Sequence, residues 1–511
     1  MSAKRFKLTK VAKILILVLI LAIAGGGIAV GMKTGVIKNG GDSDKPVSSG
    51  SAKNDETIDI SLDEWVGWSS IILANGGLTT QEGSIYDNLG LDVNIKIIND
   101  ADQSSNALIK GSLDGAGYTI NRTAFLSEKF DKAGTDVVMP FFTNYSSGGD
   151  GIIATDKFKT VESLVDAKIG VPQFSEAHSL VVWFVNNSDL TDKQKDQIID
   201  NLIFFDTPDD AAKAFFAGKI DVAATWQPYL TQAQNTSNCH VLFSTASSKN
   251  MIMDGILFRE DFASKNPELI TKFIDGTIQG IELYGKESDA VREVMPMFNG
   301  MSDADIKEMC ADAEMANWNE NKEILNETAP SVFTDMCEVW NSIGEKTNSD
   351  LVETLFDDSY LDALADKYEF NEVKKENNNV KVTEDNEMDI KNSVALLKKS
   401  ATVNFVANTA KFLDNAEASK ALDEFVKIAK TLDGSIIQIE GNIASDNDDA
   451  SGVTLSHQRA ETVKQYFVIN GIDADRIITV GNGGTKPVAP NDSEANMQMN
   501  RRTDVCFKLV E

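Results

Sequence analysis

The sequence is poor in the residues on which most catalytic and metal sites depend. It contains three histidines, far apart at His178, His240 and His457, and four cysteines without a CxxC pair. No HExxH, GxSxG or GxxxxGK[ST] stretch occurs. This absence excludes the zinc hydrolases, α/β-hydrolases and P-loop NTPases that carry these motifs. We therefore expect neither an enzyme nor a metal or cofactor site.

Basic residues are also scarce, since 48 lysines and arginines stand against 78 aspartates and glutamates and give a formal net charge of -30. Such a charge argues against a broad surface for nucleic acid or anionic lipid. The apolar fraction of 42% and the charged fraction of 25% are ordinary for globular protein. Because 511 residues exceed what one hydrophobic core usually supports, the chain is expected to form at least two domains.

The N-terminal segment contains a long run without charge. Residues 1–13 are basic, and the uncharged run at 14–32 follows them. About 19 residues at about 1.5 Å each match the roughly 30 Å hydrocarbon core of a bilayer. We predict a cytoplasmic tail, a single-pass transmembrane signal anchor at 14–32, and an extracytoplasmic remainder in the cell envelope, because the basic residues precede the run. A signal peptide cleaved after Ala22-Ile23-Ala24 is the alternative.

Two polar stretches divide the rest of the chain. Residues 33–56 are rich in Gly, Ser, Asp and Lys, which predicts a flexible tether. Residues 371–392 predict a linker between two folded regions, 57–370 and 393–511. In the first region short apolar strands alternate with amphipathic helices, the pattern of a parallel α/β sheet.

The clearest α/β unit in that region begins at Thr207. Thr207 is a candidate N-cap, Pro208 fits the first helical position, and Gly218 ends the helix. The strand that follows delivers Thr225 and Trp226 to its carboxyl end, the edge at which open α/β sheets bind ligands.

A second candidate unit lies at "KIGVPQFSEAHSL", where Ser175 is a candidate N-cap and His178 lies in the first turn. A helix start of this kind attracts anions. Hydroxyls and glycine amides at Ser146, Ser147 and Gly148 precede another strand, and Trp68 and Ser69 lie at a strand-to-helix turn. These groups suit a small polar ligand.

Five stretches occur in the same order as in one known family. They are "GW", "ALIKGSLDGAGY", "SSGGDGIIAT", "TVESLVDAKIGVPQFSEAHSL" and "DAAKAFFAGKIDVAATWQPY". Over about 58–286 the chain thus resembles the nitrate/sulfonate/taurine-type substrate-binding proteins of ABC importers. The resemblance implies a two-lobed type II periplasmic-binding-protein fold that captures a small anion or organic nutrient for an ABC permease. By position, it places six residues near the ligand: Trp68, Ser69, Thr119, Ser146, Ser175 and Trp226. The other candidate ligand residues, which lie beside these in the sequence, are Asn121, Ser147, Gly148, His178 and Thr225.

Several of these residues also have a structural interpretation. Trp68 and Trp226 are also candidates for packing, Ser175 for capping its helix alone, and His178 for a structural role. Arg122 is a candidate partner for an anionic ligand, and a surface salt bridge is its other interpretation.

The region 393–511 has the pattern of a compact α/β sandwich. Strands are predicted at 401–407, 435–441, 475–484 and 500–510, and helices at 416–432 and from Ser456 onward. With Ser456 as N-cap, Arg459 lies in the first turn, where the helix dipole disfavours a cation. An anion is then needed, either a loop carboxylate (Asp446, Asp448 or Asp449) or an external carboxylate.

Three motifs, "LSHQRAETVKQYF", "GIDADRIITVGNGGTKP" and "NRR", give this region a resemblance to the OmpA-like peptidoglycan-binding domain. The resemblance implies that Arg459 grips a carboxylate of the wall peptide, assisted by a TDxxG aspartate. Ala444 stands at that aspartate's position, which leaves Asn442 and Asp446 as the neighbouring candidates. The favoured hypothesis is a membrane-tethered solute-binding protein that contacts peptidoglycan. The alternative is a wall-anchoring protein whose two-lobed region is degenerate or recognises another partner.

Overall fold

The computed structural model describes residues 57–509, with gaps at 284–288, 295–298, 301, 303–305, 308–309, 369–379 and 447–449. The predicted anchor at 14–32 and tether at 33–56 lie outside the described residues, as does part of the predicted linker. In the part that is described, every helix is too short or too polar to span a bilayer.

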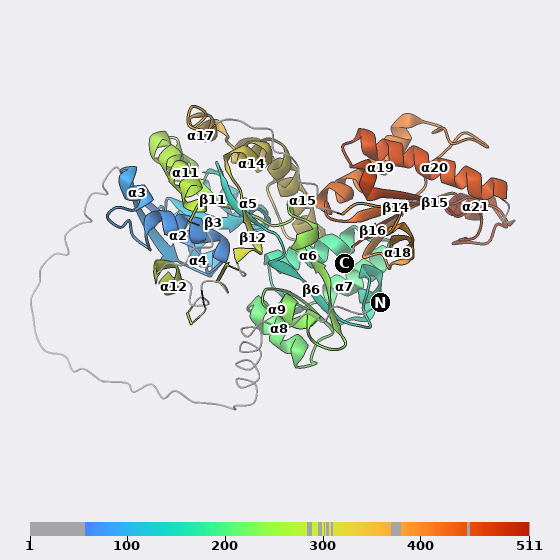
Figure 1. The fold of residues 1–511 in the computed structure, drawn as a ribbon, viewed down its shortest axis with the longest axis horizontal. Helices are drawn as coiled ribbons and strands as arrows, with labels where there is room; N and C mark the ends of the chain where they lie inside the picture. Colours follow the sequence, from blue (N-terminus) through green and yellow to red (C-terminus); the bar gives the residue numbers. More distant parts are fainter. Residues whose placement is uncertain are drawn as a thin grey trace, which may run out of the picture. The chain divides into compact units, whose positions relative to one another are not determined.

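A seven-stranded sheet forms the first lobe, in the order β12-β5-β11-β3-β1-β2 with β4 beside β11. The strands are β1 (Thr57–Leu62), β2 (Asp92–Ile97), β3 (Gly115–Thr119), β4 (Val137–Val138), β5 (Phe142–Ser146), β11 (Met253–Arg259) and β12 (Ala313–Met315). The helices are α2 (Ser69–Asn75), α3 (Ile85–Asn88), α4 (Ala101–Ile109), α5 (Ile120–Ala133), α10 (Glu260–Ala263) and α11 (Pro267–Ile281). Helix α5 packs on β3 and β11, and α11 packs on α2 (Figure 1).

A five-stranded sheet forms the second lobe, in the order β10-β6-β9-β7-β8. Its strands are β6 (Asp150–Thr155), β7 (Ile169–Pro172), β8 (Ile203–Phe205), β9 (Val222–Trp226) and β10 (Cys239–Ser244). Its helices are α6 (Glu176–Asn186), α7 (Asp192–Asp200), α8 (Pro208–Phe216) and α9 (Tyr229–Gln234). The predicted caps are present, because Ser175 accepts the N–H of His178 and Thr207 accepts that of Asp210.

Both sheets are mixed, so the prediction of parallel sheets is wrong in part. Strand β1 is parallel to β3, and β7 is parallel to β8 and β9. However, β11 runs antiparallel to β3, and β6 runs antiparallel to β9. These two strands are the ones that the chain enters directly from the other lobe, so the crossovers set their direction.

A helical segment follows the two lobes in the chain. It contains α12 (Asp289–Val294), α14 (Trp318–Glu323), α15 (Ala329–Ser342), α16 (Val352–Leu355) and α17 (Ser359–Asp362). Helix α15 packs against α5 of the first lobe and α6 of the second. The indole of Trp340 in α15 donates from Nε1 to the Asn121 carbonyl oxygen at 3.0 Å. This helix therefore contacts both lobes.

The C-terminal region is a four-stranded sheet in the order β13-β16-β14-β15. It contains α18 (Glu387–Asn392), β13 (Leu397–Ala401), α19 (Asn415–Thr431), β14 (Ile436–Gly441), α20 (Ala450–Ile469), β15 (Ile477–Gly481), α21 (Glu494–Asn500) and β16 (Thr503–Lys508). Helix α20 packs on β14 and β15. The expected two-lobed α/β fold with a C-terminal α/β sandwich is confirmed.

Two local predictions in this region are wrong. The first strand is Leu397–Ala401, earlier than the predicted 401–407, because these residues pair with β16. Helix α20 begins at Ala450, so Ser456 is an internal residue and no N-cap. Its buried hydroxyl donates to the Val453 carbonyl oxygen at 2.9 Å and accepts the N–H of Gly483 at 2.9 Å.

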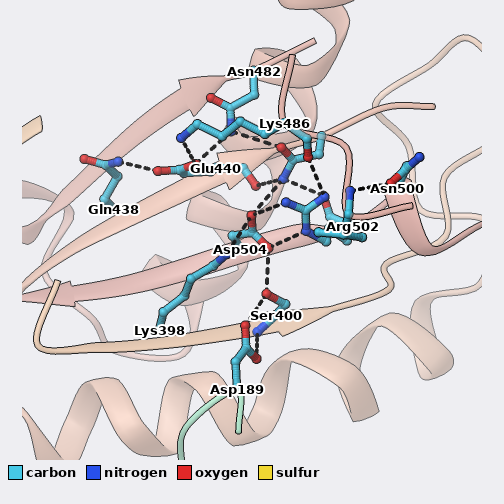
Figure 2. A network of polar contacts seen from close by, with 12 residues as sticks. Asp189, Lys398, Ser400, Gln438, Glu440, Asn482, Lys486, Asn500, Arg502 and Asp504 are labelled. Carbon is cyan, nitrogen blue, oxygen red and sulfur yellow. Dashed lines mark hydrogen bonds and ion pairs between the residues drawn. The ribbon is translucent and has the colours of Figure 1, made fainter. Parts of the chain in front are cut away.

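The C-terminal sheet carries a buried polar network, shown in Figure 2. Asp504 on β16 is 1% exposed and pairs with both Arg502 Nε (2.9 Å) and Arg502 Nη2 (3.0 Å). Its Oδ1 also accepts from Ser400 Oγ at 2.7 Å. The Ser400 N–H donates to Asp189 of the second lobe at 2.7 Å. The network therefore joins β13 and β16 to a loop of the second lobe.

Candidate functional site

The chain crosses between the two lobes twice, once from β5 to β6 and once from β10 to β11. Thr245 lies on the second crossover, and its side chain forms hydrogen bonds with residues of the first crossover. Its Oγ1 lies 2.8 Å from Ser146 Oγ and accepts the N–H groups of Gly148 (2.9 Å) and Asp150 (3.3 Å). Ser146 and Gly148, predicted at the ligand, thus lie in the hinge, and Ser147 donates its N–H to the Asp312 carbonyl oxygen at 2.9 Å.

Polar side chains form a row across three neighbouring strands of the first lobe. Asp254 on β11 is in register with Asn144 on β5 and with Thr119 on β3. Asn144 Oδ1 accepts from Trp65 Nε1 at 3.0 Å, and Thr119 Oγ1 donates to Glu176 Oε1 at 2.8 Å. Strand β5 ends, and β11 begins, at a crossover, so this row lies at the junction of the lobes.

The N-terminus of α6 meets the first lobe at the same junction. Glu176 is the first residue of α6 and accepts from Thr119. It also pairs with Arg122 of α5 at 3.4 Å. Asn121 Nδ2 donates to Ser179 Oγ at 3.0 Å. Thr119, Asn121 and Ser175 are therefore close to the interlobe junction, and Arg122 forms a half-buried ion pair.

The other predicted ligand residues are mostly buried and already bonded. Trp68 donates from Nε1 to Asp63 Oδ1 at 2.6 Å, and Ser69 Oγ donates to the Val66 carbonyl oxygen at 2.6 Å. Thr225 Oγ1 donates to the Pro208 carbonyl oxygen at 3.0 Å. Trp226, partly buried, donates from Nε1 to Asp209 Oδ1 at 2.8 Å and lies opposite Asp150 on β6.

His178 is buried in the second lobe. Its Nδ1 accepts the N–H of Phe174 at 3.2 Å, and its ring packs edge-on against Trp340. Burial lowers the pKa of His178 to about 4, so the imidazole is neutral at physiological pH.

Four carboxylates lie close enough to the junction to influence one another electrostatically, and the sequence patterns did not single them out as a group. They are Asp63, Asp150, Glu176 and Asp254. Asp63 is solvent-exposed, Asp150 and Glu176 are partly exposed, and Asp254 is 3% exposed. The only sequence signal for Asp254 is a carboxylate at the start of the apolar strand "MDGILF".

The carboxylates influence one another electrostatically. Protein packed around Asp63 raises its pKa to about 6, although its surface remains open to solvent. Burial, followed by the charges of Glu176 and Asp63, raises the pKa of Asp150 to about 7. Burial, and then the charges of Asp63, Asp150 and Glu176, raise the pKa of Asp254 well above its usual value. Burial acts in the same direction on Glu176, but Arg122 and Thr119 outweigh it and lower the pKa.

The predicted wall site surrounds Arg459 on α20. Arg459 lies nine residues after the Ala450 helix start, so the helix dipole does not call for an anion there, contrary to the prediction. Its Nε donates to the Thr409 carbonyl oxygen at 3.0 Å, and its guanidinium lies 4.9 Å from the Phe405 ring centroid. Among the described residues no carboxylate is within ion-pair distance of Arg459. Burial and then Arg501 lower its pKa.

A small pocket includes Arg459. It is lined by Val403, Phe405, Gly441, Asn442, Arg459, Arg501, Arg502 and Thr503. Asn442 donates from Nδ2 to Asp504 Oδ2 at 3.1 Å and so also bonds to the buried polar network of the C-terminal sheet. Asp446 accepts from Asn491 Nδ2 at 2.9 Å. Asp448 and Asp449 lie outside the described residues.

The three residues of the "NRR" motif have different roles. Asn500 Oδ1 accepts the N–H groups of Val488 (2.8 Å) and Ala489 (3.1 Å) and holds that loop. Arg501 pairs with exposed Glu494 at 2.5 Å. Arg502 forms the buried pair with Asp504. Of these three residues, Arg501 and Arg502 line the pocket of Arg459 and Asn500 does not.

Residues 404–501 match the family model described as the OmpA family. This part of the chain is an OmpA domain. The OmpA domain resembles outer membrane protein A of Bordetella avium, with 36% identity over 89 residues that cover 17% of this chain and 46% of that protein. The chain spans less than half the length of the first curated relatives that it matches.

Two further proteins are similar. A peptidoglycan-associated lipoprotein of Buchnera aphidicola is 27% identical over 185 residues, covering 36% of this chain and 95% of that protein. The structure of the periplasmic aliphatic sulphonate binding protein SsuA from Escherichia coli aligns with 17% identity, over 60% of this chain and 99% of that chain, with a TM-score of 0.47.

Proposed function

We propose that this protein captures a small solute between its two lobes, outside the cytoplasmic membrane, and delivers it to an ABC permease. The OmpA domain contacts peptidoglycan, and the apolar run at 14–32 tethers the chain to the membrane. In this proposal the protein works in the cell envelope as a binding protein and carries out no chemical reaction.

One observation carries the solute-binding role, namely the convergence of polar side chains at the junction of two lobes that are joined by two crossovers. Asp254, Asn144 and Thr119 lie in register there, and Glu176 reaches the row from the other lobe. Two lobes connected by a pair of crossovers can close on a ligand by bending at these segments.

The solute role is tested by thermal unfolding of the full-length protein with phosphate, nitrate, sulfonates, bicarbonate and small organic nutrients. Binding to the folded state alone raises the midpoint temperature in proportion to the logarithm of ligand concentration. We expect such a rise for at least one class of compound. The absence of stabilisation by any of them, together with strong binding to purified wall, would instead support the wall-anchoring alternative.

Arg459 carries the wall-binding role. Its guanidinium has a backbone partner and an aromatic neighbour, and no carboxylate neutralises it in the described part of the domain. A guanidinium can hold a peptide carboxylate with two parallel hydrogen bonds. The names of two similar proteins, a peptidoglycan-associated lipoprotein and a peptidoglycan-binding protein, support this ligand.

Co-sedimentation of the full-length protein with purified peptidoglycan tests that role. Arg459→Ala should reduce binding about tenfold or more, because one charge-assisted contact is lost. Lys420→Ala, an exposed change on α19, is the matched control and should bind normally. Arg502→Ala is unsuitable as a control, because it breaks a buried ion pair. Equal binding by Arg459→Ala and the unchanged protein would remove Arg459 from the site.

A further inference from the structure

The interlobe junction is strongly acidic. Asp63, Asp150, Glu176 and Asp254 act on one another electrostatically. Within the described part of the chain, Arg122 is the cation that acts on this group, and its guanidinium is already held by Glu176 at 3.4 Å. A ligand that enters the junction therefore meets carboxylates contributed by both lobes.

Asp254 lies deepest in this group, and one oxygen of its carboxyl group lacks a partner. It is 3% exposed, and its Oδ2 makes no hydrogen bond with any described residue. The side chains on either side of it in the row are already engaged, Asn144 with Trp65 and Thr119 with Glu176. A buried carboxylate oxygen without a donor is unfavourable, and such groups in native proteins usually serve a ligand.

The same geometry disfavours an anion. The N-terminus of α6 would ordinarily attract one, but Glu176 lies in its first turn and takes the interaction with Arg122. An oxyanion placed there would face the charges of Asp63 and Asp150, and the described residues offer no free cation to balance them. The charge at the junction thus opposes the nitrate-like or sulfonate-like ligand expected from the family resemblance.

We propose that the interlobe site selects a small organic cation with N–H donors, a protonated amine or amidine. Its donors pair with Asp254 Oδ2, and Asp63 and Asp150 balance its charge. Trp65, which is partly buried and whose Nε1 donates to Asn144 at 3.0 Å, forms an aromatic wall beside the row. This assignment rests on the proposed solute-binding function and names its substrate class.

Two other cations fit the junction less well. No group of three or more Asp, Glu, His or Cys side chains within the described residues has the geometry to hold a metal ion. A quaternary ammonium has no N–H donor and leaves Asp254 Oδ2 unpaired. The amine or amidine satisfies both the charge and the missing hydrogen bond.

Thermal unfolding and calorimetry of the full-length protein distinguish these ligands. The cationic probes are ethanolamine, putrescine and agmatine, the quaternary probe is choline, and the anionic probes are nitrate, sulfate and methanesulfonate. We expect stabilisation by at least one amine or amidine and none by the anions. Stabilisation by anions alone would overturn the cation assignment and leave the solute-binding function intact. Stabilisation by no probe would count against both.

Asp254→Asn tests the residue directly, because it preserves the shape of the side chain and removes its ability to ionise. The affinity for the bound amine should fall at least tenfold, while the ligand-free protein becomes more stable because an unpaired buried carboxylate is gone. Asp200→Asn, at the exposed end of α7, is the matched control and should change neither quantity. A stabilised Asp254→Asn protein that retains full amine affinity would show that Asp254 is only structural.

Discussion

At the scale of single residues, Asp150 reports the cost of burying a carboxylate between the lobes beside other carboxylates. Its pKa rises to about 7, from about 3.9 in an unfolded chain. As the pH rises, the Asp150 carboxyl group therefore loses its proton in the unfolded chain before it does so in the folded protein. The free energy of unfolding should consequently fall between about pH 4 and pH 7 and then level off.

Asp150→Asn removes this contribution. It should stabilise the free protein by about 2 kcal/mol at pH 8, a value reduced for the partial exposure of the side chain, and by almost nothing at pH 4. Urea unfolding at the two pH values measures the difference. A gain of the same size at both pH values would show that the change acts through packing or hydrogen bonding, and that ionisation of Asp150 is not the cause.

The residues that sequence analysis could identify are those whose role is local. Ser175 and Thr207 cap helices as predicted, because a cap depends on residues within one turn. Asp63 and Asp254 are far apart in the sequence and influence each other only because the fold brings them into one lobe, so no local pattern could group them. The pairing of Arg122 with Glu176 likewise depends on how α5 and α6 approach each other.

At the scale of elements, the close packing of α20 on the OmpA sheet depends on Gly441. A Cβ at this position of β14 would lie 2.0 Å from the Ser456 carbonyl oxygen, which belongs to the helix backbone. Gly441→Ala must therefore move α20, which also carries Arg459, and should lower the free energy of unfolding of the domain by about 2–3 kcal/mol. Peptidoglycan binding should weaken with it.

Gly471→Ala is the matched control for that experiment. Gly471 has a φ of +92° and no atom near an added Cβ, so alanine introduces backbone strain without crowding. Gly471→Ala should lower the free energy of unfolding by about 1 kcal/mol. It should leave wall binding unchanged. Urea unfolding and co-sedimentation of both variants make the comparison. Equal losses of wall binding would contradict a role for the packing of α20 in placing Arg459.

Two elements, β1 and α20, differ in how well they could be predicted from the sequence. Short apolar strands were expected in the first region, and β1 is one of them, with Ile58 and Ile60 fully buried. The start of α20 was placed six residues too late, because Gly452 and the polar residues around it give no helical pattern. That error produced the argument for an anion at Arg459, so a wrong boundary changed the chemistry inferred from it.

At the scale of the whole molecule, the formal net charge of -30 surrounds a site whose own side chains are acidic. Long-range fields of this kind accelerate the approach of ligands of opposite charge and slow those of like charge. The effect weakens as salt is added, because the Debye length falls from about 30 Å at 0.01 M to about 8 Å at 0.15 M. The sign of the salt dependence therefore reports the charge of the natural solute.

For an amine ligand, the association rate constant of the full-length protein should fall several-fold between 0.01 M and 0.5 M sodium chloride. Stopped-flow mixing, followed by the fluorescence of the tryptophans near the junction, measures it. The dissociation rate should change less, since the contact with buried Asp254 is shielded from salt. A rate constant that rises with salt would identify an anionic solute and contradict the cation assignment, whereas the solute-binding function would stand.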